Sequence, residues 1–341
     1  MSKSTMLRLV SIHALMKHLN RCEVVIILFL LWATLWPLVF PNWMSFGYKL
    51  VADRDIDADV FSCHTLNTTV DNRADCPLVD TRLEPLVTAL TQTDSHLLDT
   101  IADRYDIKLG GRHEPRECRS RQKVAVIVPF RDRWPHLKLF VQHMHPFLVS
   151  QRLDYQIFIV EQMDTNGFNR GKLFNIGFRE AIKMDPEFCC FIFHDIDVLP
   201  INRRQTYQCS RSPRHMCSAL DKFRYVLIYP DLLGGVVAIS RSQYELVNGY
   251  SNRFEGWGAE DDDFYNRIKA KGLVLTRWSQ QISRCLMLRH KPEKPNPSRM
   301  ALLESGRARF QSDGLNDLQN SYQILAVHFE PLYTIIKAKL S

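Results

Sequence analysis

The chain has 341 residues, of which 45% are hydrophobic, so it can hold one large or two ordinary domains and is neither disordered nor fibrous. Its 44 Lys and Arg against 37 Asp and Glu give a formal charge of +7, and the basic residues form no stripe with interleaved aromatics. Nucleic acid is therefore not an expected partner. A phosphate-bearing substrate fits this charge, and so does a merely solvated basic surface.

The amino-terminal part is predicted to be a membrane anchor. Basic residues precede Glu23, and from Val24 to Tyr48 no residue carries a formal charge. This stretch exceeds the roughly 20 apolar residues that a membrane-spanning helix needs, and it lacks the cleavage site of a signal peptide. Because positive charge precedes it, we expect residues 1–23 in the cytosol, the anchor at 24–44 and everything beyond on the lumenal side. A buried core helix is the alternative.

Residues 45–75 lack helical or strand periodicity and are interpreted as a stem. This stretch contains the acceptor sequon for N-glycosylation, at Asn67. On the lumenal side, the eight cysteines beyond Cys22 are expected to pair as disulfides, and the lack of a CxxC pair argues against a structural zinc site. Their spacing does not fix which cysteine pairs with which.

Beyond residue 123, strands and helices are predicted to alternate. Continuous apolar runs at 124–128, 156–160 and 189–193 indicate strands covered on both faces, and residues 137–148 and 172–183 have helical patterns. Ligands of open α/β sheets bind beyond the carboxyl ends of the strands. We therefore expect the polar residues that follow the first and third runs to meet in one cleft.

Two clusters of carboxylates carry most of the chemical information. Asp195 and Asp197 follow an apolar strand, where they stay ionised only if a cation or water compensates them, so a divalent metal is expected. The second cluster, Glu260 to Asp263, follows Gly256-Trp257-Gly258. Its glycines allow close backbone approach and its indole offers a stacking face, as in a substrate site. The alternative is that these acids cap the next helix and complement its dipole.

Motifs in register over residues 76–335 resemble the β1,4-galactosyltransferase family, which is glycosyltransferase family 7. They are VPFRDR at 128–133, FNRGK at 168–172, HDID at 194–197, GGV at 234–236, GWGAEDDD at 256–263 and MLRH at 287–290. The resemblance implies a GT-A fold, a Rossmann-like mixed α/β sheet, as a lumenal catalytic domain at 76–341. It also implies a single-pass type II protein of the Golgi membrane that uses Mn²⁺ and a UDP-sugar and inverts the anomeric centre.

The same resemblance implies a role for each site residue. The metal ligands are Asp197, Met287 and His290, and the last two can share one site only if the chain turns between them, because residues three apart on a strand face opposite sides. Asp261 is the catalytic base that takes the proton of the acceptor 4-hydroxyl. The residues implied to contact the UDP-sugar are Pro129, Phe130, Arg131, Arg133, Phe168, Arg170, Asp195, Ile196, Lys222, Gly235 and Trp257. Those implied around the transferred sugar or the acceptor are Tyr229, Leu232, Glu260, Asp262, Arg299, Met300 and Leu303.

Three more features follow from the resemblance. The Pro-rich run Lys291–Pro297 resembles the mobile lid of the family, and Ala259 stands where members often have Gly. The implied disulfides are Cys76–Cys118 and Cys190–Cys209. The pairing of Cys63, Cys189, Cys217 and Cys285 stays open.

The donor sugar is predicted from Leu232. Galactose-specific members typically have Tyr at this position, two residues before the glycine pair, where its bulk and hydroxyl crowd the C2 substituent of the donor. Leu is smaller and cannot form a hydrogen bond, so an N-acetyl group can enter. We predict transfer from UDP-GalNAc to GlcNAc-terminated glycans, which forms GalNAcβ1,4GlcNAc. Transfer from UDP-galactose is the alternative, followed by xylose or glucose acceptors and by a non-enzymatic Golgi lectin.

Overall fold

The computed structural model describes residues 21–39, 47–63, 73–78, 86–87, 92–291 and 293–341. The chain divides into two units, residues 1–46 and 47–341. The first contains helix α2, Arg21–Val39. Within the described ranges no helix is both long and apolar enough to cross a membrane. Residues 24–39 of the anchor predicted at 24–44 lie in α2, and residues 40–44 lie outside the described residues.

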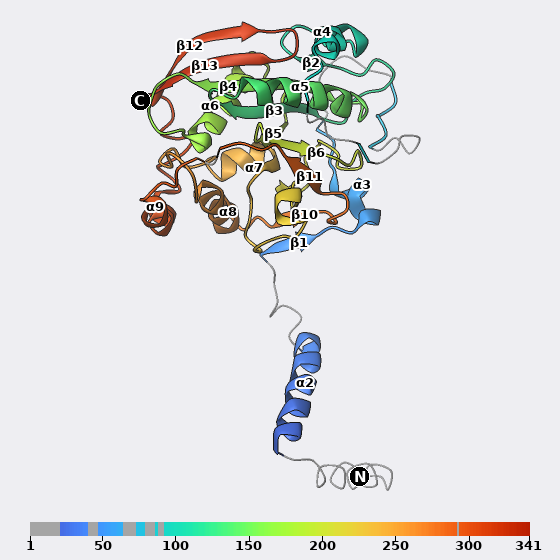
Figure 1. Cartoon of the computed structure of the whole chain (residues 1–341), viewed down its shortest axis with the longest axis vertical. Coiled ribbons are helices and arrows are strands. Elements are labelled where there is room, and N and C mark those ends of the chain that lie inside the picture. Colours follow the sequence, from blue (N-terminus) through green and yellow to red (C-terminus); the bar gives the residue numbers. More distant parts are fainter. Residues whose placement is uncertain (1–20, 40–46, 64–72, 79–85, 88–91, 292) are drawn as a thin grey trace. The chain divides into compact units, whose positions relative to one another are not determined.

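The second unit is built around a mixed sheet that holds ten strands among the described residues (Figure 1). β3 lies between β4 and β5 and runs parallel to both, while β9 is antiparallel to β5. The order of the strands across the sheet is β1 (Tyr48–Leu50), β10 (Leu275–Arg277), β7 (Arg214–His215), β9 (Val236–Ser240), β5 (Cys190–His194), β3 (Lys123–Phe130), β4 (Asp154–Gln162), β13 (Thr334–Leu340) and β12 (Tyr322–Phe329). The remaining strand, β2 (Arg112–His113), pairs with β4.

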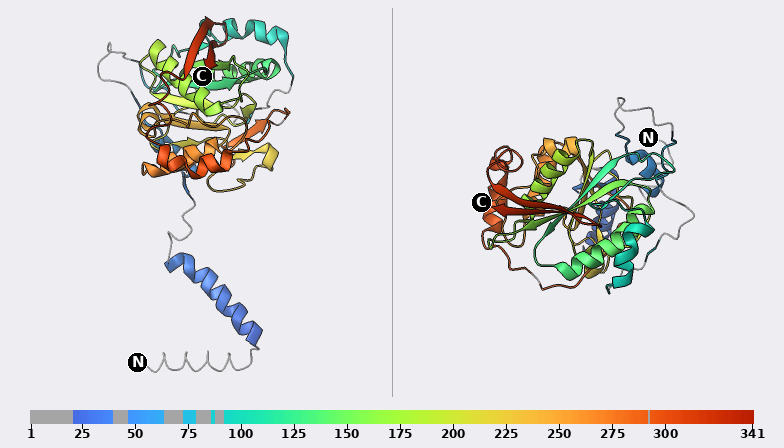
Figure 2. Two further views of the ribbon diagram at one scale, coloured as in Figure 1. Left: turned by 90° about the vertical axis from the view of Figure 1, so that its left-hand side faces the viewer. Right: turned by 90° about the horizontal axis from the view of Figure 1, so that it is seen from above.

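Helices cover both faces of this sheet (Figure 2). Val124, Val126 and Val128 of β3 join one core cluster, and the residues between them, Ala125 and Ile127, join the other. This alternation follows from the two-residue period of a strand, and it explains the continuous apolar runs in the sequence. The first cluster also contains residues of α4 (Ser95–Arg104) and α5 (Trp134–Val149), and the second contains residues of α6 (Arg170–Met184), α7 (Arg241–Leu246) and α8 (Glu260–Ala270).

A smaller three-stranded sheet adjoins the main one. β11 (Arg284–Met287) pairs antiparallel with β6 (Val198–Pro200) and parallel with β8 (Ala219–Leu220), which leads into the 3-10 helix η2 (Asp221–Phe223). Two short helices follow β11 along the chain, α9 (Arg299–Glu304) and α10 (Gly306–Arg309).

The segment predicted as a stem is partly folded. β1 extends the main sheet by pairing with β10, and η1 (Asp53–Asp55) and α3 (Ile56–Asp59) follow it. Val51, Ile56 and Val60 form a buried cluster with Trp278, whose indole N–H donates to Asp59 at 3.1 Å. These elements are too short for a periodic pattern and are held by a distant Trp, which is why the sequence did not reveal them. Asn67 lies outside the described residues.

All eight cysteines of the second unit form disulfides. Cys76–Cys118 and Cys190–Cys209 are present, as the resemblance implied. The open pairings are resolved as Cys63–Cys189 and Cys217–Cys285, which join segments 126 and 68 residues apart in sequence.

Candidate active site

A pocket with a volume of about 910 Å³ opens where β3 and β5 end. Because these neighbouring strands are parallel, their carboxyl ends meet at one edge of the sheet, and the residues that follow them share the pocket as predicted. The predicted site residues that line it are Pro129, Arg131, Arg133, Phe168, Arg170, Asp195, Ile196, Asp197, Lys222, Trp257, Glu260, Asp261, Met287 and His290.

Asp197 and His290 face each other in this pocket, with Nε2 of the ring 2.7 Å from Oδ2 of the carboxylate. The other ring nitrogen, Nδ1, lies 2.8 Å from the carbonyl of Lys291, which can only accept, so Nδ1 carries a hydrogen and Nε2 is directed at Asp197. Burial acts to raise the pKa of Asp197, but the hydrogen bond and charge of His290, with Arg133 at 3.7 Å, outweigh it and lower that pKa. The same hydrogen bond raises the pKa of His290.

Met287 reaches the same site from β11. It pairs with Val198, which follows Asp197, and its backbone N–H donates to Oδ1 of Asp221 at 2.8 Å. The assigned strand ends at Met287, although the N–H of Leu288 still donates to the carbonyl of Asp197 at 2.7 Å. Met287 and His290 both line the pocket, and the turn predicted between them stays a prediction.

These side chains fit a divalent transition metal. Carboxylate oxygen and imidazole nitrogen are ordinary ligands of such ions, and the thioether of Met287 is a softer third donor. Among the described residues, this pocket included, no three or more His, Cys, Asp and Glu side chains group together as metal ligands, so the third donor here would be the thioether of Met287. We therefore retain Asp197, Met287 and His290 as the candidate ligands.

Arg170 connects three carboxylates of the pocket. Its guanidinium lies 2.6 Å from Asp195, 3.3 Å from Glu260 and 3.4 Å from Asp261, and it packs over the ring of Phe174. One cation cannot neutralise three acids. Burial raises the pKa of Asp195 to about 6, and burial and the charge of Asp261 raise that of Glu260 well above its usual value. The raised pKa of Glu260 favours the protonated form of that side chain beside Asp261.

The four acids at the start of α8 have different partners. Asp263 binds Arg267 inside the core at 2.7 Å, and Asp262 accepts a hydrogen bond from Tyr229 at 3.1 Å, so neither lines the pocket. The N-cap position is Ala259, which has a φ of 72° and forms no side-chain cap. This left-handed conformation explains why Gly suits the position. Helix capping therefore does not account for Glu260 and Asp261, which face the pocket.

Two residues predicted to contact the nucleotide lie elsewhere. Phe130 is 1% exposed and packs edge-on against Trp134, because it points to the α5 side of the sheet. Phe168 supplies the aromatic surface instead, with the guanidinium of Arg131 5.3 Å from its ring. Gly235 acts through its backbone: its φ of 90° favours glycine, and its carbonyl accepts from the N–H of Asp195 at 3.0 Å.

Leu232 lies beside the candidate base without lining the main pocket. A Cβ added to Gly234 would lie 2.7 Å from Oδ2 of Asp261 and 4.0 Å from Cδ1 of Leu232, so these two side chains flank Gly234. Leu232 is thus close to Asp261, the candidate base.

The residues predicted at the acceptor are only loosely gathered. The guanidinium of Arg299 lies 5.8 Å from the ring of Trp257, whereas Met300 is 54% exposed, and neither Met300 nor Leu303 lines the pocket. The Pro-rich run lies along Trp257, whose N–H donates to the carbonyl of Lys294 at 3.1 Å. Glu293 and Pro295 of this run line the pocket, which is the placement expected of a lid.

Sequence reasoning missed Asp221, which lines the pocket and accepts the N–H of Met287. Its one signal was its position next to Lys222. Leu288 and Arg289, inside a recognised motif, also line the pocket without an assigned role.

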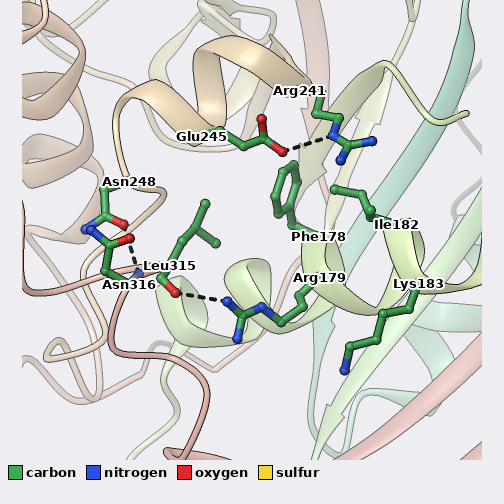
Figure 3. Close-up of a pocket in the computed structure, with 9 residues that line it drawn as sticks. All are labelled: Phe178, Arg179, Ile182, Lys183, Arg241, Glu245, Asn248, Leu315 and Asn316. Carbon is green, nitrogen blue, oxygen red and sulfur yellow. Dashed lines mark hydrogen bonds and ion pairs between the residues drawn. The ribbon is translucent and has the colours of Figure 1, made fainter. Parts of the chain in front are cut away.

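A second, smaller pocket of about 340 Å³ lies along α6 and α7 (Figure 3). Its polar groups are already engaged: Arg179 donates to the carbonyl of Leu315 at 3.2 Å, and Arg241 donates to Glu245, the one carboxylate of the lining, at 2.9 Å (Figure 3). This pocket therefore does not compete with the first as a catalytic site.

Comparison with known proteins agrees with this geometry. Residues 76–210 match the N-terminal region of glycosyl transferase group 7, and residues 214–291 match the N-terminal domain of galactosyltransferase. The chain belongs to the β1,4-galactosyltransferase family. Beta-1,4-galactosyltransferase 1 of Homo sapiens is 44% identical over 234 residues, which are 68% of this chain and 58% of that protein. Beta-1,4-galactosyltransferase 3 of Cricetulus griseus is 41% identical over 238 residues, 69% of this chain and 60% of that protein. The chain thus spans about 58–60% of the length of these relatives.

Solved structures of the family show the same fold. The catalytic domain of Drosophila beta1,4-galactosyltransferase 7, in complex with xylobiose, is 32% identical and aligns with a TM-score of 0.55 over 64% of this chain and 94% of that one. A mutant of that enzyme, 31% identical, was solved with manganese, UDP-Gal and xylobiose. The predicted mixed α/β sheet of GT-A type is therefore confirmed for the catalytic unit.

Proposed function

We propose that this protein is an inverting, Mn²⁺-dependent glycosyltransferase that transfers N-acetylgalactosamine from UDP-GalNAc to the 4-hydroxyl of terminal GlcNAc. One observation carries the reaction type: a single pocket joins the Asp197–His290 pair to the carboxylate of Asp261. Family membership supports the proposal, as do the manganese and UDP-Gal bound by the fly relative.

Each of the main residues of the pocket has its own role in the proposed reaction. Arg133 and Lys222 line it as cations suited to a diphosphate. Bound Mn²⁺ would supply positive charge to the leaving diphosphate. Asp261 accepts the proton of the acceptor hydroxyl as that oxygen attacks the anomeric carbon. Arg170 holds Asp261 in place, and the raised pKa of Glu260, caused by its burial and by the charge of Asp261, favours a neutral side chain beside the base.

The donor is proposed from Leu232, whose side chain lies with that of Asp261 beside Gly234. An aliphatic side chain there leaves room beside C2 of the donor sugar for an N-acetyl group, and it offers no hydrogen bond to a hydroxyl. UDP-galactose is the second candidate, because the curated relatives at 40–45% identity are named galactosyltransferases. GlcNAc as acceptor is likewise a proposal, and the xylobiose bound by the fly relative makes xylosides the comparison acceptor.

The test is a kinetic comparison of UDP-GalNAc with UDP-galactose on GlcNAc and xyloside acceptors at matched Mn²⁺. We expect a higher kcat/KM for UDP-GalNAc with GlcNAc. Leu232→Tyr should shift the preference toward UDP-galactose by about 1–3 kcal/mol, the usual range for steric discrimination in a pocket. Leu246→Tyr, at an exposed leucine of α7, is the matched control and should shift nothing. A wild-type preference for UDP-galactose refutes the donor assignment and leaves the reaction type intact.

We extend the proposal to localisation in the Golgi lumen. The four disulfides support it, since such bonds persist in oxidising compartments. Protease protection of intact Golgi vesicles tests the lumenal placement. Alkaline extraction of the same vesicles tests whether residues 24–44 hold the protein in the membrane.

A further inference from the structure

Two buried side chains hold the turn that carries Leu232. Nη1 of Arg277 donates to the carbonyl of Pro230 at 2.8 Å, and Nη2 donates to the carbonyl of Leu232. Nε of Arg277 donates to Nδ1 of His215 at 3.0 Å, and Nε2 of His215 lies 2.9 Å from the carbonyl of Gly234. Arg277 is 1% exposed and His215 is 0% exposed.

The chemistry of these groups fixes the direction of each bond. A guanidinium only donates, so Nδ1 of His215 must accept, and the hydrogen of the neutral ring sits on Nε2 and is donated to Gly234. Burial, followed by the charge of Arg277, lowers the pKa of His215 to about 3, which keeps the ring neutral. One Arg–His pair thus holds the carbonyls of three alternate residues, 230, 232 and 234.

The pair is also enclosed by the amino-terminal segment of the catalytic unit. Tyr48 of β1 lies over Arg277, with its ring centroid 4.0 Å from the guanidinium carbon. Tyr265 of α8 donates to the carbonyl of Gly47 at 2.8 Å, which ties this segment to the helix that carries Asp261. The turn, its support and the base therefore belong to one packed group.

We propose that Arg277 and His215 are positioning residues that set the donor-sugar preference, because they fix the backbone of residues 230–234 and so the distance of Leu232 from Asp261. This inference rests on the proposed function, since it assumes that Leu232 borders the transferred sugar. It adds that Leu232 discriminates between sugars only while its backbone is held. Neither residue contacts the sugar in this scheme.

The test compares two buried arginines on neighbouring strands. Arg277→Met removes the donors to the turn. Arg214→Met is the matched control, because Arg214 is equally buried, packs on Trp278 at 3.6 Å and donates to the carbonyls of Thr206 and Gln208, away from the turn. The measurement is the ratio of kcat/KM for UDP-GalNAc to that for UDP-galactose, with the melting temperature of each full-length variant. We expect both variants to lose stability, and only Arg277→Met to change the ratio, by about tenfold or more.

Substitutions of His215 give a second comparison that does not depend on the folding of the arginine variants. His215→Gln keeps one acceptor and one donor and should retain the wild-type ratio, whereas the apolar His215→Leu should change it as Arg277→Met does. A ratio that stays at the wild-type value in Arg277→Met and His215→Leu overturns the proposal. If the wild-type protein transfers neither sugar, the proposed function is wrong, and the melting temperatures of the variants cannot support this inference.

Discussion

Replacing Arg170 with alanine tests the electrostatic arrangement of the pocket most directly. In the wild-type protein, the side chains of Asp195, Glu260 and Asp261 lie 2.6–3.4 Å from the guanidinium of Arg170. The substitution removes this shared cation. Removal of one partner of a buried ion pair costs about 3–5 kcal/mol. Because burial and the charge of Asp261 raise the pKa of Glu260 and so favour its protonated form, we expect the lower end, about 3 kcal/mol, which is a fall of roughly 6 °C in melting temperature for a unit of this size.

Urea unfolding at pH 7 measures this loss. The control is Arg241→Ala, which removes a half-exposed i,i+4 pair with Glu245 and should cost only about 0–1 kcal/mol. In the background of Arg170→Ala, Glu260→Gln should cost little further stability, since the raised pKa of Glu260 favours the protonated carboxyl, which the neutral amide replaces. If Arg170→Ala costs no more than Arg241→Ala, the three carboxylates do not depend on this cation, and the pocket electrostatics derived above are wrong.

Four further predictions concern the base, the metal site, a strained residue and pH. Asp261→Asn should lower kcat by roughly 10²-fold or more while UDP-sugar binding is retained, and wild-type turnover would rule out Asp261 as the base. Asp197→Ala and His290→Ala should each weaken Mn²⁺ binding measured by electron paramagnetic resonance, and an unchanged affinity would remove them from the ligand set. Ala259→Gly should stabilise the protein by up to about 1 kcal/mol in thermal unfolding, because Ala is held at positive φ; a loss of stability contradicts this. Burial lowers the pKa of His145 to about 4, below its value of 6.5 when unfolded, so the unfolded state binds more protons between these values; His145 should contribute about 3 kcal/mol to the loss of stability as the pH drops from 6.5 to 4, and His145→Gln should reduce the slope by that amount.

Much of the site was predictable because its signals are local. The apolar runs that become β3 and β5 reveal themselves by composition, and parallel strands must end at one edge, so residues 129–133 and 195–197 had to share a pocket. The strand β11 ends at Met287, so the regular strand that would have put Met287 and His290 on opposite faces does not reach His290. The motifs were enough to indicate the family, since six of them occur in order.

The sequence by itself thus determined the sheet, the pocket edge and the identity of the candidate ligands and base. The tertiary structure alone decided that Arg170 forms ion pairs with three acidic side chains and that Cys217 pairs with Cys285. It also made β1 part of the main sheet, where Tyr48 covers Arg277. Periodicity and motifs record what a residue's near neighbours require, whereas these contacts join segments tens to hundreds of residues apart. Such contacts exist only once the helices and strands have packed, so no local pattern in the chain encodes them.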